Sequence, residues 1–560
     1  MVASSASVEL PPFYYRDNFL CLCDTVEDQY GDILAGDELE FLRTFRTLSS
    51  PAQCLYVRLV SRVGPWFRAA RLAYGELGDS QPILAELDGL GLLHRATSLT
   101  PGELGALFTR DELLAVMGEY IDSSAVSGKP SLLAAIAESP LDAAASTRML
   151  CDFDGESIVG PLYIEQVQCL QVLFFGNRRQ GLTDFVLSDL GVARYFPYSL
   201  DRGHRLFADR MALDEYLACA AFSDRWYELR DAGPETPVDT DLLTLAVELL
   251  QVQIVHDSSR GRWYRLCNGV ARDLERVGEL ETALELYAAS GRHPCRERRA
   301  RILERSGRLR EARALCERIL EQPWCEEERD AADRILPRLR RALEGVPQPR
   351  RRDSFDELQL ELPRGDLAVE VLAALALERE WASVHYVENT LMNALFGLAF
   401  WEQIFLPVPG AFHNPFQSVP GDMYQPEFSR RRRTALDRRL GELARQDLGQ
   451  ELVDAWHRYR GYQCRWVDWR KIDPELVARV TALVPPGHLL AIWERMLFDP
   501  GENRRGFPDL IALGEKPGDY CLIEVKGPGD ALQDSQKRWL RFFREQAVPA
   551  RVAWVEWRDD

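Results

Sequence analysis

Apolar residues recur at helical spacing through the N-terminal and central parts of the chain. In LEFLRTFRTLSSPAQCLYVRLVSR, residues 39–62, they lie about 3.6 residues apart, and a Ser-Ser-Pro break separates two predicted helices. Residues 82–117 contain two helix starts, each with an N-capping threonine followed by an acidic first turn. The pattern predicts a helical region over 1–82, a small helical module over 83–125 and a helical connecting region over 126–245.

An internal repeat follows. The segment ERVGELETALELYAAS, residues 275–290, matches ERSGRLREARALCERI, residues 304–319, at a period of 29. The match aligns Gly278 with Gly307 and Ala283 with Ala312. A glycine after one helix and small residues at fixed offsets are typical of packed helical hairpins. We therefore expect tetratricopeptide-like helical repeats over residues 246–366, ending in a proline-containing and arginine-rich linker.

The pattern becomes mixed after Leu367. Residues 384–405 read as a helix, whereas the apolar runs at 509–513 and 520–527 read as strands joined by a Pro-Gly turn. A helix over 534–546 and a strand over 550–557 complete the chain. The predicted fold is thus multidomain: mostly α-helical N-terminal and central regions, and a C-terminal α/β domain over residues 367–560.

Composition narrows the class of protein. Of 560 residues, 46% are hydrophobic and 28% are charged, which is ordinary for a soluble protein. No apolar stretch is long enough to span a bilayer, and the first residues lack the features of a signal peptide, so we expect a cytoplasmic protein. The twelve cysteines form no CxxC pair, which argues against a zinc ribbon or finger.

Basic residues are clustered although the net charge is −19. Residues 292–318 hold ten arginines against four glutamates, and further arginine runs lie at 350–352 and 430–433. Such clusters have two interpretations: solvated helix faces that pair with neighbouring glutamates, or surfaces that face phosphates.

Three charged residues lie in or beside the predicted C-terminal strands. Glu524 and Lys526 are two positions apart, so their side chains share one face of a strand, and Asp509 starts the preceding strand. Two carboxylates can hold a hard cation such as Mg²⁺, and a lysine beside them can assist attack on a phosphate. This is the PD-(D/E)xK arrangement of metal-dependent nucleases. The alternative is an exposed edge hairpin with a salt bridge.

Glu388 is a second candidate acid. Val384, Leu391, Met392 and Leu395 lie at helical offsets from it, which would place a carboxylate on an apolar helix face. Such a carboxylate either lies at the rim of the core or points at a functional site.

These segments resemble a known family. RRGFPDL, CLIEVKGPGDALQDSQKRWLRFF and ARVAWVEW are similar to the virus-type replication-repair nuclease (VRR-NUC) domain. The segments NFLCLCDTVEDQYGDIL, AQCLYVRLVSRVGPWFR and LFFGNRRQGLTDFVLSDLG resemble the bacterial branch of the Fanconi-associated nuclease family. The resemblance implies catalytic roles for Glu388, Asp509, Glu524, Lys526 and Gln536. It also implies a Mg²⁺ or Mn²⁺ ion held by the three carboxylates and the Val525 carbonyl.

The family also implies a function. Its members are structure-selective DNA nucleases that cut 5′ flaps and related branched DNA, have 5′-to-3′ exonuclease activity and act in interstrand crosslink repair. Residues 83–125 would correspond to a SAP-like DNA-binding module. No ubiquitin-binding zinc finger and no membrane association are expected, and the location would be the bacterial cytoplasm, at the nucleoid during repair.

Branched or flapped double-stranded DNA is the expected partner, gripped through phosphates. The expected contacts are five N-terminal residues and three repeat residues: Arg58, Arg62, Trp66, Arg68, Arg71, Arg298, Arg301 and Arg305. No helix-turn-helix with base-reading side chains is visible. Two alternatives stay open: a catalytically degenerate helical-repeat DNA-binding scaffold, which the intact site residues disfavour, and a metal-dependent hydrolase acting on RNA or nucleotides.

Overall fold

The computed structural model describes residues 12–62, 64–121, 127–155, 157–178, 180, 194–231, 238–345 and 353–558. The chain forms two compact units, Met1–Ala193 and Arg194–Asp560. The arginine run at 350–352 lies outside the described residues.

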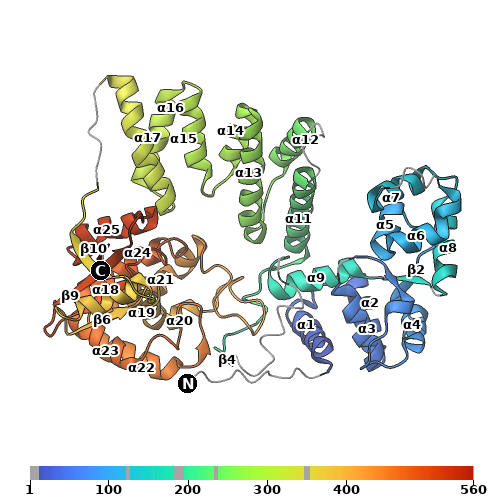
Figure 1. The fold of residues 1–560 in the computed structure, drawn as a ribbon, viewed down its shortest axis with the longest axis horizontal. Helices are drawn as coiled ribbons and strands as arrows, with labels where there is room; N and C mark the ends of the chain where they lie inside the picture. Colours follow the sequence, from blue (N-terminus) through green and yellow to red (C-terminus); the bar gives the residue numbers. More distant parts are fainter. Residues whose placement is uncertain are drawn as a thin grey trace. The chain divides into compact units, whose positions relative to one another are not determined.

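The first unit is helical with a small antiparallel sheet (Figure 1). Its strands are β1 (Phe67–Arg68), β2 (Leu93–Arg95) and β3 (Ile158–Pro161), in the order β1-β3-β2. Its helices are α1 (Tyr14–Tyr30), α2 (Gly36–Thr47), α3 (Ser50–Val60), α4 (Ser80–Gly89), α5 (Pro101–Leu107), α6 (Arg110–Met117), α7 (Lys129–Glu138), α8 (Ala143–Asp154) and α9 (Ile164–Phe175).

The two helix starts predicted in this unit are present. Thr100 and Thr109 cap α5 and α6, and each accepts a hydrogen bond from the backbone N–H three residues later. Glu103 and Glu112 return a bond to the threonine N–H groups at 2.7 Å, which completes two capping boxes. The three short strands around them were not predicted.

The second unit begins with a helical array. It comprises α11 (Arg210–Asp231), α12 (Val238–Gln251), α13 (Asp257–Val277), α14 (Leu280–Ala289), α15 (Cys295–Arg305), α16 (Leu309–Glu321) and α17 (Glu326–Glu344). The 29-residue repeat corresponds to the α13–α14 and α15–α16 hairpins. Gly278 and Gly307 have φ of 95° and 75°, and Ala283 and Ala312 are fully buried where the paired helices pack.

A five-stranded mixed sheet forms the α/β part of the same unit. Its strands are β5 (Glu357–Pro363), β6 (Ser383–Tyr386), β8 (Leu510–Leu513), β9 (Tyr520–Lys526) and β10 (Ala550–Arg558), in the order β5-β10-β9-β8-β6. β5, β10 and β9 are parallel, whereas β8 pairs antiparallel with β9 and β6. The domain boundary expected at residue 367 therefore leaves out one strand of the sheet.

Helices cover both faces of this sheet. α18 (Val369–Leu377) packs on one face against Leu510 and Ile523, while Ile511 and Leu522 join the larger core on the other face. The larger core is built by α19 (Leu391–Ala399), α20 (Trp401–Ile404), α21 (Glu427–Leu443), α22 (Leu448–Tyr459), α23 (Pro474–Leu483), α24 (Pro486–Phe498) and α25 (Asp534–Glu545). β4 (Arg194–Tyr195) pairs with β7 (Tyr462–Gln463) at its margin.

Among the described residues, no single helix is long and apolar enough to cross a membrane. Only α23 and α24 taken together are long and apolar enough to do so, and these two helices are bent by 110° at their junction.

Candidate active site

The β8–β9 hairpin brings the predicted site residues together. Asp509 directly precedes β8, and its Oδ2 accepts a hydrogen bond from the Val525 N–H at 2.8 Å. Glu524 and Lys526 share one face of β9, with 2.9 Å between Oε1 and Nζ. β9 lies between β10 and β8, and all three charged residues are buried, Glu524 with only 1% exposure. An exposed edge hairpin is therefore excluded.

Burial makes ionisation of the two carboxyl groups costly. Desolvation, followed by the nearby Asp509 charge, raises the pKa of Glu524 to about 8, although Lys526 opposes this rise. Desolvation also raises the pKa of Asp509 to about 6, and the charge of Glu388 adds to the effect. Two acids held close together at high pKa are a site prepared for a positive charge.

The donor set fits a hard divalent cation. Oε2 of Glu524 is buried and has no hydrogen-bond partner among the described residues. A buried carboxylate oxygen left without a partner is unfavourable unless a cation or water completes it. Because the converging groups are carboxylates and no cysteine or histidine is among them, oxygen-preferring ions such as Mg²⁺ or Mn²⁺ match the site.

Glu388 reaches this site from a loop, so the prediction of a helical position was wrong. β6 ends at Tyr386 and α19 starts at Leu391, and Asn389 between them has φ of 48°. The Val387 N–H donates to the Asp509 carbonyl at 2.8 Å, which fixes the loop beside the hairpin. The apolar residues at helical offsets from Glu388 come partly from the strand and partly from α19.

The carboxylate of Glu388 is held by its neighbours. It is exposed, and it accepts hydrogen bonds from the Tyr386 hydroxyl at 2.7 Å and from Asn389 Nδ2 at 3.2 Å. The bond to Glu388 is the main reason why the pKa of Tyr386 is raised. Tyr386 was not foreseen, because nothing in its local sequence distinguishes it from other strand tyrosines.

Gln536 connects α25 to the buried carboxylate. Its Nε2 donates to Glu524 Oε1, and its Oε1 accepts from the Gln533 N–H at 2.8 Å. The helix is anchored below by Trp539, which stacks on Phe507 with 4.1 Å between ring centroids. The glutamine therefore has a fixed orientation at the site.

A cavity of about 690 Å³ opens beside these residues. The cavity lies between the helical array and the sheet domain. The array contributes Glu297, Glu327 and Arg334 to its lining, and the sheet domain contributes Glu388, Asn389 and Gln536. Of the predicted site residues, Glu388 and Gln536 line this polar space, so the cavity adjoins the site within the second unit.

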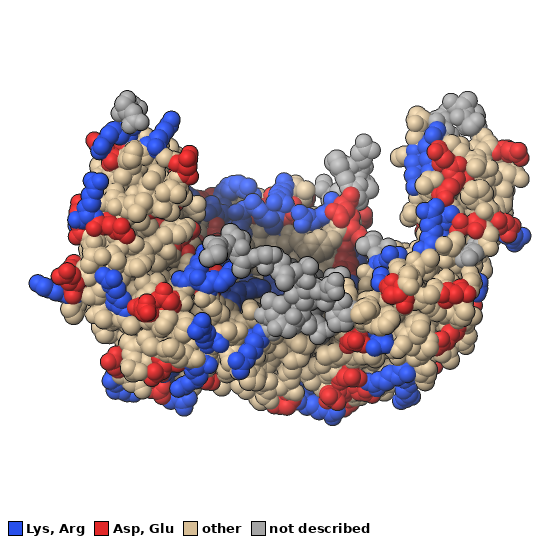
Figure 2. Space-filling model, turned by 60° about the horizontal axis from the view of Figure 1, so that its bottom comes forward, with Lys and Arg blue, Asp and Glu red and all other residues tan. Residues whose placement is uncertain are grey.

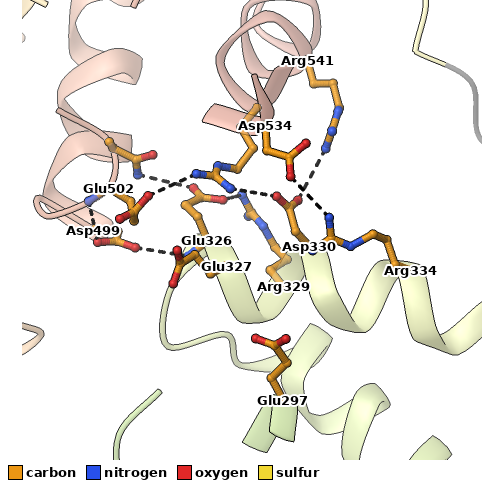
Figure 3. A network of polar contacts seen from close by, with 12 residues as sticks. Glu297, Glu326, Glu327, Arg329, Asp330, Arg334, Asp499, Glu502, Asp534 and Arg541 are labelled. Atoms are coloured by element: carbon orange, nitrogen blue, oxygen red, sulfur yellow. Dashed lines mark hydrogen bonds and ion pairs between the residues drawn. The ribbon is translucent and has the colours of Figure 1, made fainter. Parts of the chain in front are cut away.

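An ionic network ties α17 of the array to α25 (Figure 3). Arg538 of α25 contacts Asp330 at 3.1 Å and Glu502 at 3.2 Å, and Arg541 contacts Asp330 at 3.5 Å. Glu326 at the start of α17 is buried against Arg495 of α24 at 3.2 Å. The sequence carries no local signal for these pairs, because the partners lie in different elements and most are more than 160 positions apart.

The N-terminal residues predicted to contact DNA have different environments. Arg68 is only 7% exposed, and its guanidinium is held by Asp154 and by Glu112, the latter at 2.9 Å. Arg68 was predicted to contact DNA, but its guanidinium is instead used in buried ion pairs with two acidic residues, which lie 44 and 86 positions away in the sequence.

The other N-terminal candidates retain accessible surface. Arg58 pairs with Glu76 and stacks between Tyr15 and Tyr74. Arg62 and Arg71 are exposed. Arg71 contacts Glu112 at 3.2 Å, and Trp66 donates from its indole N–H to Glu103 at 3.1 Å.

The three repeat arginines are paired with glutamates. Arg298 binds the buried Glu275, Arg305 lies 3.8 Å from the same carboxylate, and Arg301 contacts Glu297 at 2.8 Å. These contacts favour the interpretation that the repeat arginines stabilise the array. In the view of Figure 2, Lys and Arg are interspersed with Asp and Glu towards the edges, whereas Lys and Arg predominate at the centre.

Comparisons with known proteins agree with this architecture. The family described as VRR-NUC domain matches residues 444–557, and the family described as FAN1, HTH domain matches residues 13–94. The second match indicates a helix-turn-helix in the N-terminal region, where no such motif with base-reading side chains was visible in the sequence. Within the matched residues, the two helices predicted around the Ser-Ser-Pro break are present as α2 and α3, and Ser49 caps α3.

Relatives align with nearly the whole chain. The Fanconi-associated nuclease 1 homolog of Pseudomonas aeruginosa is 34% identical, over 98% of this chain and 97% of its own length. The Arabidopsis thaliana homolog is 25% identical and the human protein 23%; both match 97% of this chain, which spans 67% and 62% of their lengths.

Solved structures of similar chains contain DNA. The crystal structure of paFAN1 bound to 2-nucleotide 5′-flap DNA with a gap superimposes with a TM-score of 0.83 at 33% identity, over 99% of this chain and 100% of that chain. A second paFAN1 structure, with 1-nucleotide 5′-flap DNA, gives 0.81 at 33% identity, over 98% and 100%. With the buried carboxylate pair in a VRR-NUC domain, these matches show that the chain belongs to the Fanconi-associated nuclease 1 family and is a DNA nuclease.

Proposed function

We propose that this chain cuts 5′ flaps and related branched DNA, with 5′-to-3′ exonuclease activity, during interstrand crosslink repair in the bacterial cytoplasm. The observation that carries the proposal is the buried Asp509–Glu524–Lys526 group beside a polar cavity, in a chain whose similar structures hold 5′-flap DNA. Association with the nucleoid during repair is part of this proposal.

Four groups would hold a divalent cation, Mg²⁺ or Mn²⁺. Asp509 and Glu524 supply buried carboxylate oxygens, Glu388 supplies an exposed one, and the Val525 carbonyl completes the set. When bound, the cation would supply Lewis-acid charge that polarises the scissile phosphate and lowers the pKa of water. It would also remove the cost of keeping Glu524 ionised inside the protein.

Lys526 and Gln536 would act on the groups around the cation. The Lys526 ammonium, held 2.9 Å from Glu524, is placed to orient the attacking water and to offset the negative charge of the phosphate. Gln536 holds Oε1 of Glu524 by its amide, so that Oε2 keeps its direction. Rigid support of this kind is what keeps a catalytic group in productive geometry.

Selectivity for branched DNA would come from the helical regions. Phosphate contacts do not depend on base sequence, so exposed arginines such as Arg62 and Arg71 can hold a duplex arm of any sequence. Trp66, which is half-buried beside His94, would stack on a base at a junction. The three predicted arginines of α15 are paired with glutamates, so we assign them to the stability of the array rather than to such contacts.

One assay tests the proposal against both alternatives. The purified protein is incubated with a labelled 5′-flap DNA, an RNA of the same sequence and a mononucleotide, each with Mg²⁺ and with EDTA. Cutting of the flap alone, only with Mg²⁺, is the expected result. Preferred hydrolysis of the RNA or mononucleotide would support the hydrolase alternative, and binding without cutting would support the scaffold.

Variants connect the activity to the site. Asp509→Ala and Glu524→Ala should abolish cutting, and Glu388→Ala should do so if this exposed carboxylate completes the cation shell. All should bind flap DNA. Glu515→Gln is the matched control, because Glu515 is an exposed carboxylate in the β8–β9 turn. Normal cutting by Glu388→Ala would assign Glu388 to loop structure instead.

A further inference from the structure

A second group of metal-ligating side chains lies in the helical array. His293 precedes α15, Cys325 caps the start of α17, and Glu327 lies in the first turn of α17. One ligand atom from each of the three residues lies within 4.8 Å of the other two. The imidazole Nε2 of His293 is 2.9 Å from Glu327 Oε2, so at least two of these groups already face each other.

A fourth possible ligand comes from α15. Glu297 Oε2 is 3.9 Å from His293 Nε2, while its other oxygen is used by Arg301. Figure 3 shows Glu297 pointing from α15 towards α17, where Glu327 lies. Both glutamates line the cavity described above, so ions can reach the cluster from solvent.

The backbone around the cluster is fixed. Asn268 donates to the carbonyls of Arg292 and His293 at 3.0 and 3.2 Å, which holds the loop before α15. Arg296 stacks on Trp324, 3.8 Å from the ring centre, and binds Glu328, which joins α15 to the start of α17. The ligand-bearing segments therefore cannot move freely relative to each other.

One nitrogen of the His293 ring has no hydrogen bond among the described residues. This nitrogen is Nδ1, and it is buried. An imidazole nitrogen without a hydrogen-bond partner can serve as a metal ligand when a cation takes the place of the ring proton. A simple histidine–glutamate ion pair would not require the cysteine sulfur to converge on the same point.

We propose that His293, Cys325 and Glu327, with Glu297 as a fourth ligand, form a binding site for a thiophilic divalent cation of the Zn²⁺ class. Ligand atoms around tetrahedral zinc are about 3.3–3.8 Å apart, given bond lengths of about 2.0–2.3 Å. The 2.9 Å between His293 Nε2 and Glu327 Oε2 would have to open slightly, whereas the larger separations, at most 4.8 Å among the three ligand atoms, would have to close. Imidazole, thiolate and carboxylate select such a cation, whereas the all-oxygen nuclease site selects a hard one.

A bound cation would cross-link two consecutive hairpins of the helical array. A cation held by the loop before α15 and by the first turn of α17 links the successive hairpins of the array. Because a cation that binds only the folded state stabilises it, zinc should raise the melting temperature of the array. The proposal concerns stability and does not depend on the nuclease function.

Cobalt is the sensitive probe of this site. Co²⁺ added to the metal-free full-length protein should give visible d–d bands of a tetrahedral centre and a near-ultraviolet thiolate charge-transfer band. One Zn²⁺ equivalent should abolish both bands. Cys325→Ser should lose the charge-transfer band, and His293→Gln should weaken zinc binding at least tenfold. Cys151→Ser, which changes a half-buried cysteine of α8, is the matched control.

An Asp509→Ala background separates the two sites. This variant should keep the cobalt spectrum and the zinc-dependent rise in melting temperature, because the hard-ion site is distinct. The proposal is overturned if Co²⁺ gives no thiolate band, or if Cys325→Ser retains it. It is also overturned if zinc stabilises Cys325→Ser as much as the wild type. Loss of nuclease activity has no bearing on this outcome.

Discussion

Replacing Glu524 by glutamine should make the metal-free protein more stable while it abolishes cutting. Glu524 is 1% exposed and its Oε2 lacks a hydrogen-bond partner among the described residues, so its ionised form is unfavourable without a cation. Glutamine keeps the shape and the contact with Lys526 and removes the charge. The substitution Glu524→Gln is therefore expected to raise the stability of the metal-free protein and to abolish its nuclease activity.

The size of the effect follows from the pKa of Glu524. The group has a pKa near 4.5 when unfolded and about 8 when folded. Because the folded state binds the Glu524 proton more tightly, the contribution of this group to the free energy of unfolding is fully present below pH 4.5 and falls as the pH rises towards 8. Since pH 7 is 2.5 units above the unfolded pKa, about 3 kcal/mol has been lost at pH 7, at about 1.4 kcal/mol per unit. Glu524→Gln should recover a large part of this energy.

Thermal melting in EDTA measures the effect. For a domain of about 200 residues, 3 kcal/mol corresponds to a rise of roughly 6–12 °C. The difference from wild type should grow between pH 6 and pH 8, and millimolar Mg²⁺ should stabilise the wild type alone. Glu388→Gln is the control, because its carboxylate is exposed. An unchanged or lower melting temperature of Glu524→Gln in EDTA at pH 8 would refute the reasoning.

Four further predictions concern the site and its supports. Lys526→Ala should slow single-turnover cutting by about a hundredfold while flap affinity stays constant; an equal loss of affinity would contradict a chemical role. Asp330→Asn, which removes the partner of two α25 arginines, should cost about 2–3 kcal/mol in a melting curve. Arg334→Gln, in an exposed pair, should cost far less; equal effects would argue against the network. At limiting Mg²⁺, metal affinity should rise from pH 6 to pH 8, because Asp509 and Glu524 must lose protons; constant affinity would contradict the assigned ligands. Replacing Arg298, Arg301 and Arg305 of α15 together by glutamine should lower the melting temperature and leave the salt dependence of flap binding unchanged. If the slope of log affinity against log salt falls by about one unit per arginine, these residues contact DNA after all.

Local patterns predicted what local forces determine. The capping boxes of α5 and α6, the 29-residue repeat and the β8–β9 hairpin depend on residues close in sequence, and all are present. The shared face of Glu524 and Lys526 followed from the two-residue period of a strand, and the place of Asp509 beside them followed from the expected hairpin. Glu388 was misplaced on a helix, because a four-residue strand before a turn shows the same apolar spacing as one helical turn.

Contacts between distant segments could not be predicted in this way. Arg68 read as a surface cation, since Asp154, which buries it, lies 86 positions later. The array and the sheet domain meet through Asp330 and Arg538, which are 208 residues apart. Nothing in the pattern around either residue marks it as a member of a pair.

The position of β5 limits where the catalytic part of this chain can be separated from the rest. β10 is paired on both sides, and the Asp356 carbonyl and the Ser354 carbonyl accept bonds from Val552 and Arg544. A fragment that starts at residue 367 would remove this cover and turn β10 into an open edge carrying ARVAWVEW. Such an edge recruits other chains by strand addition. Fragments of the nuclease domain should therefore stay monomeric only if they begin before Asp353.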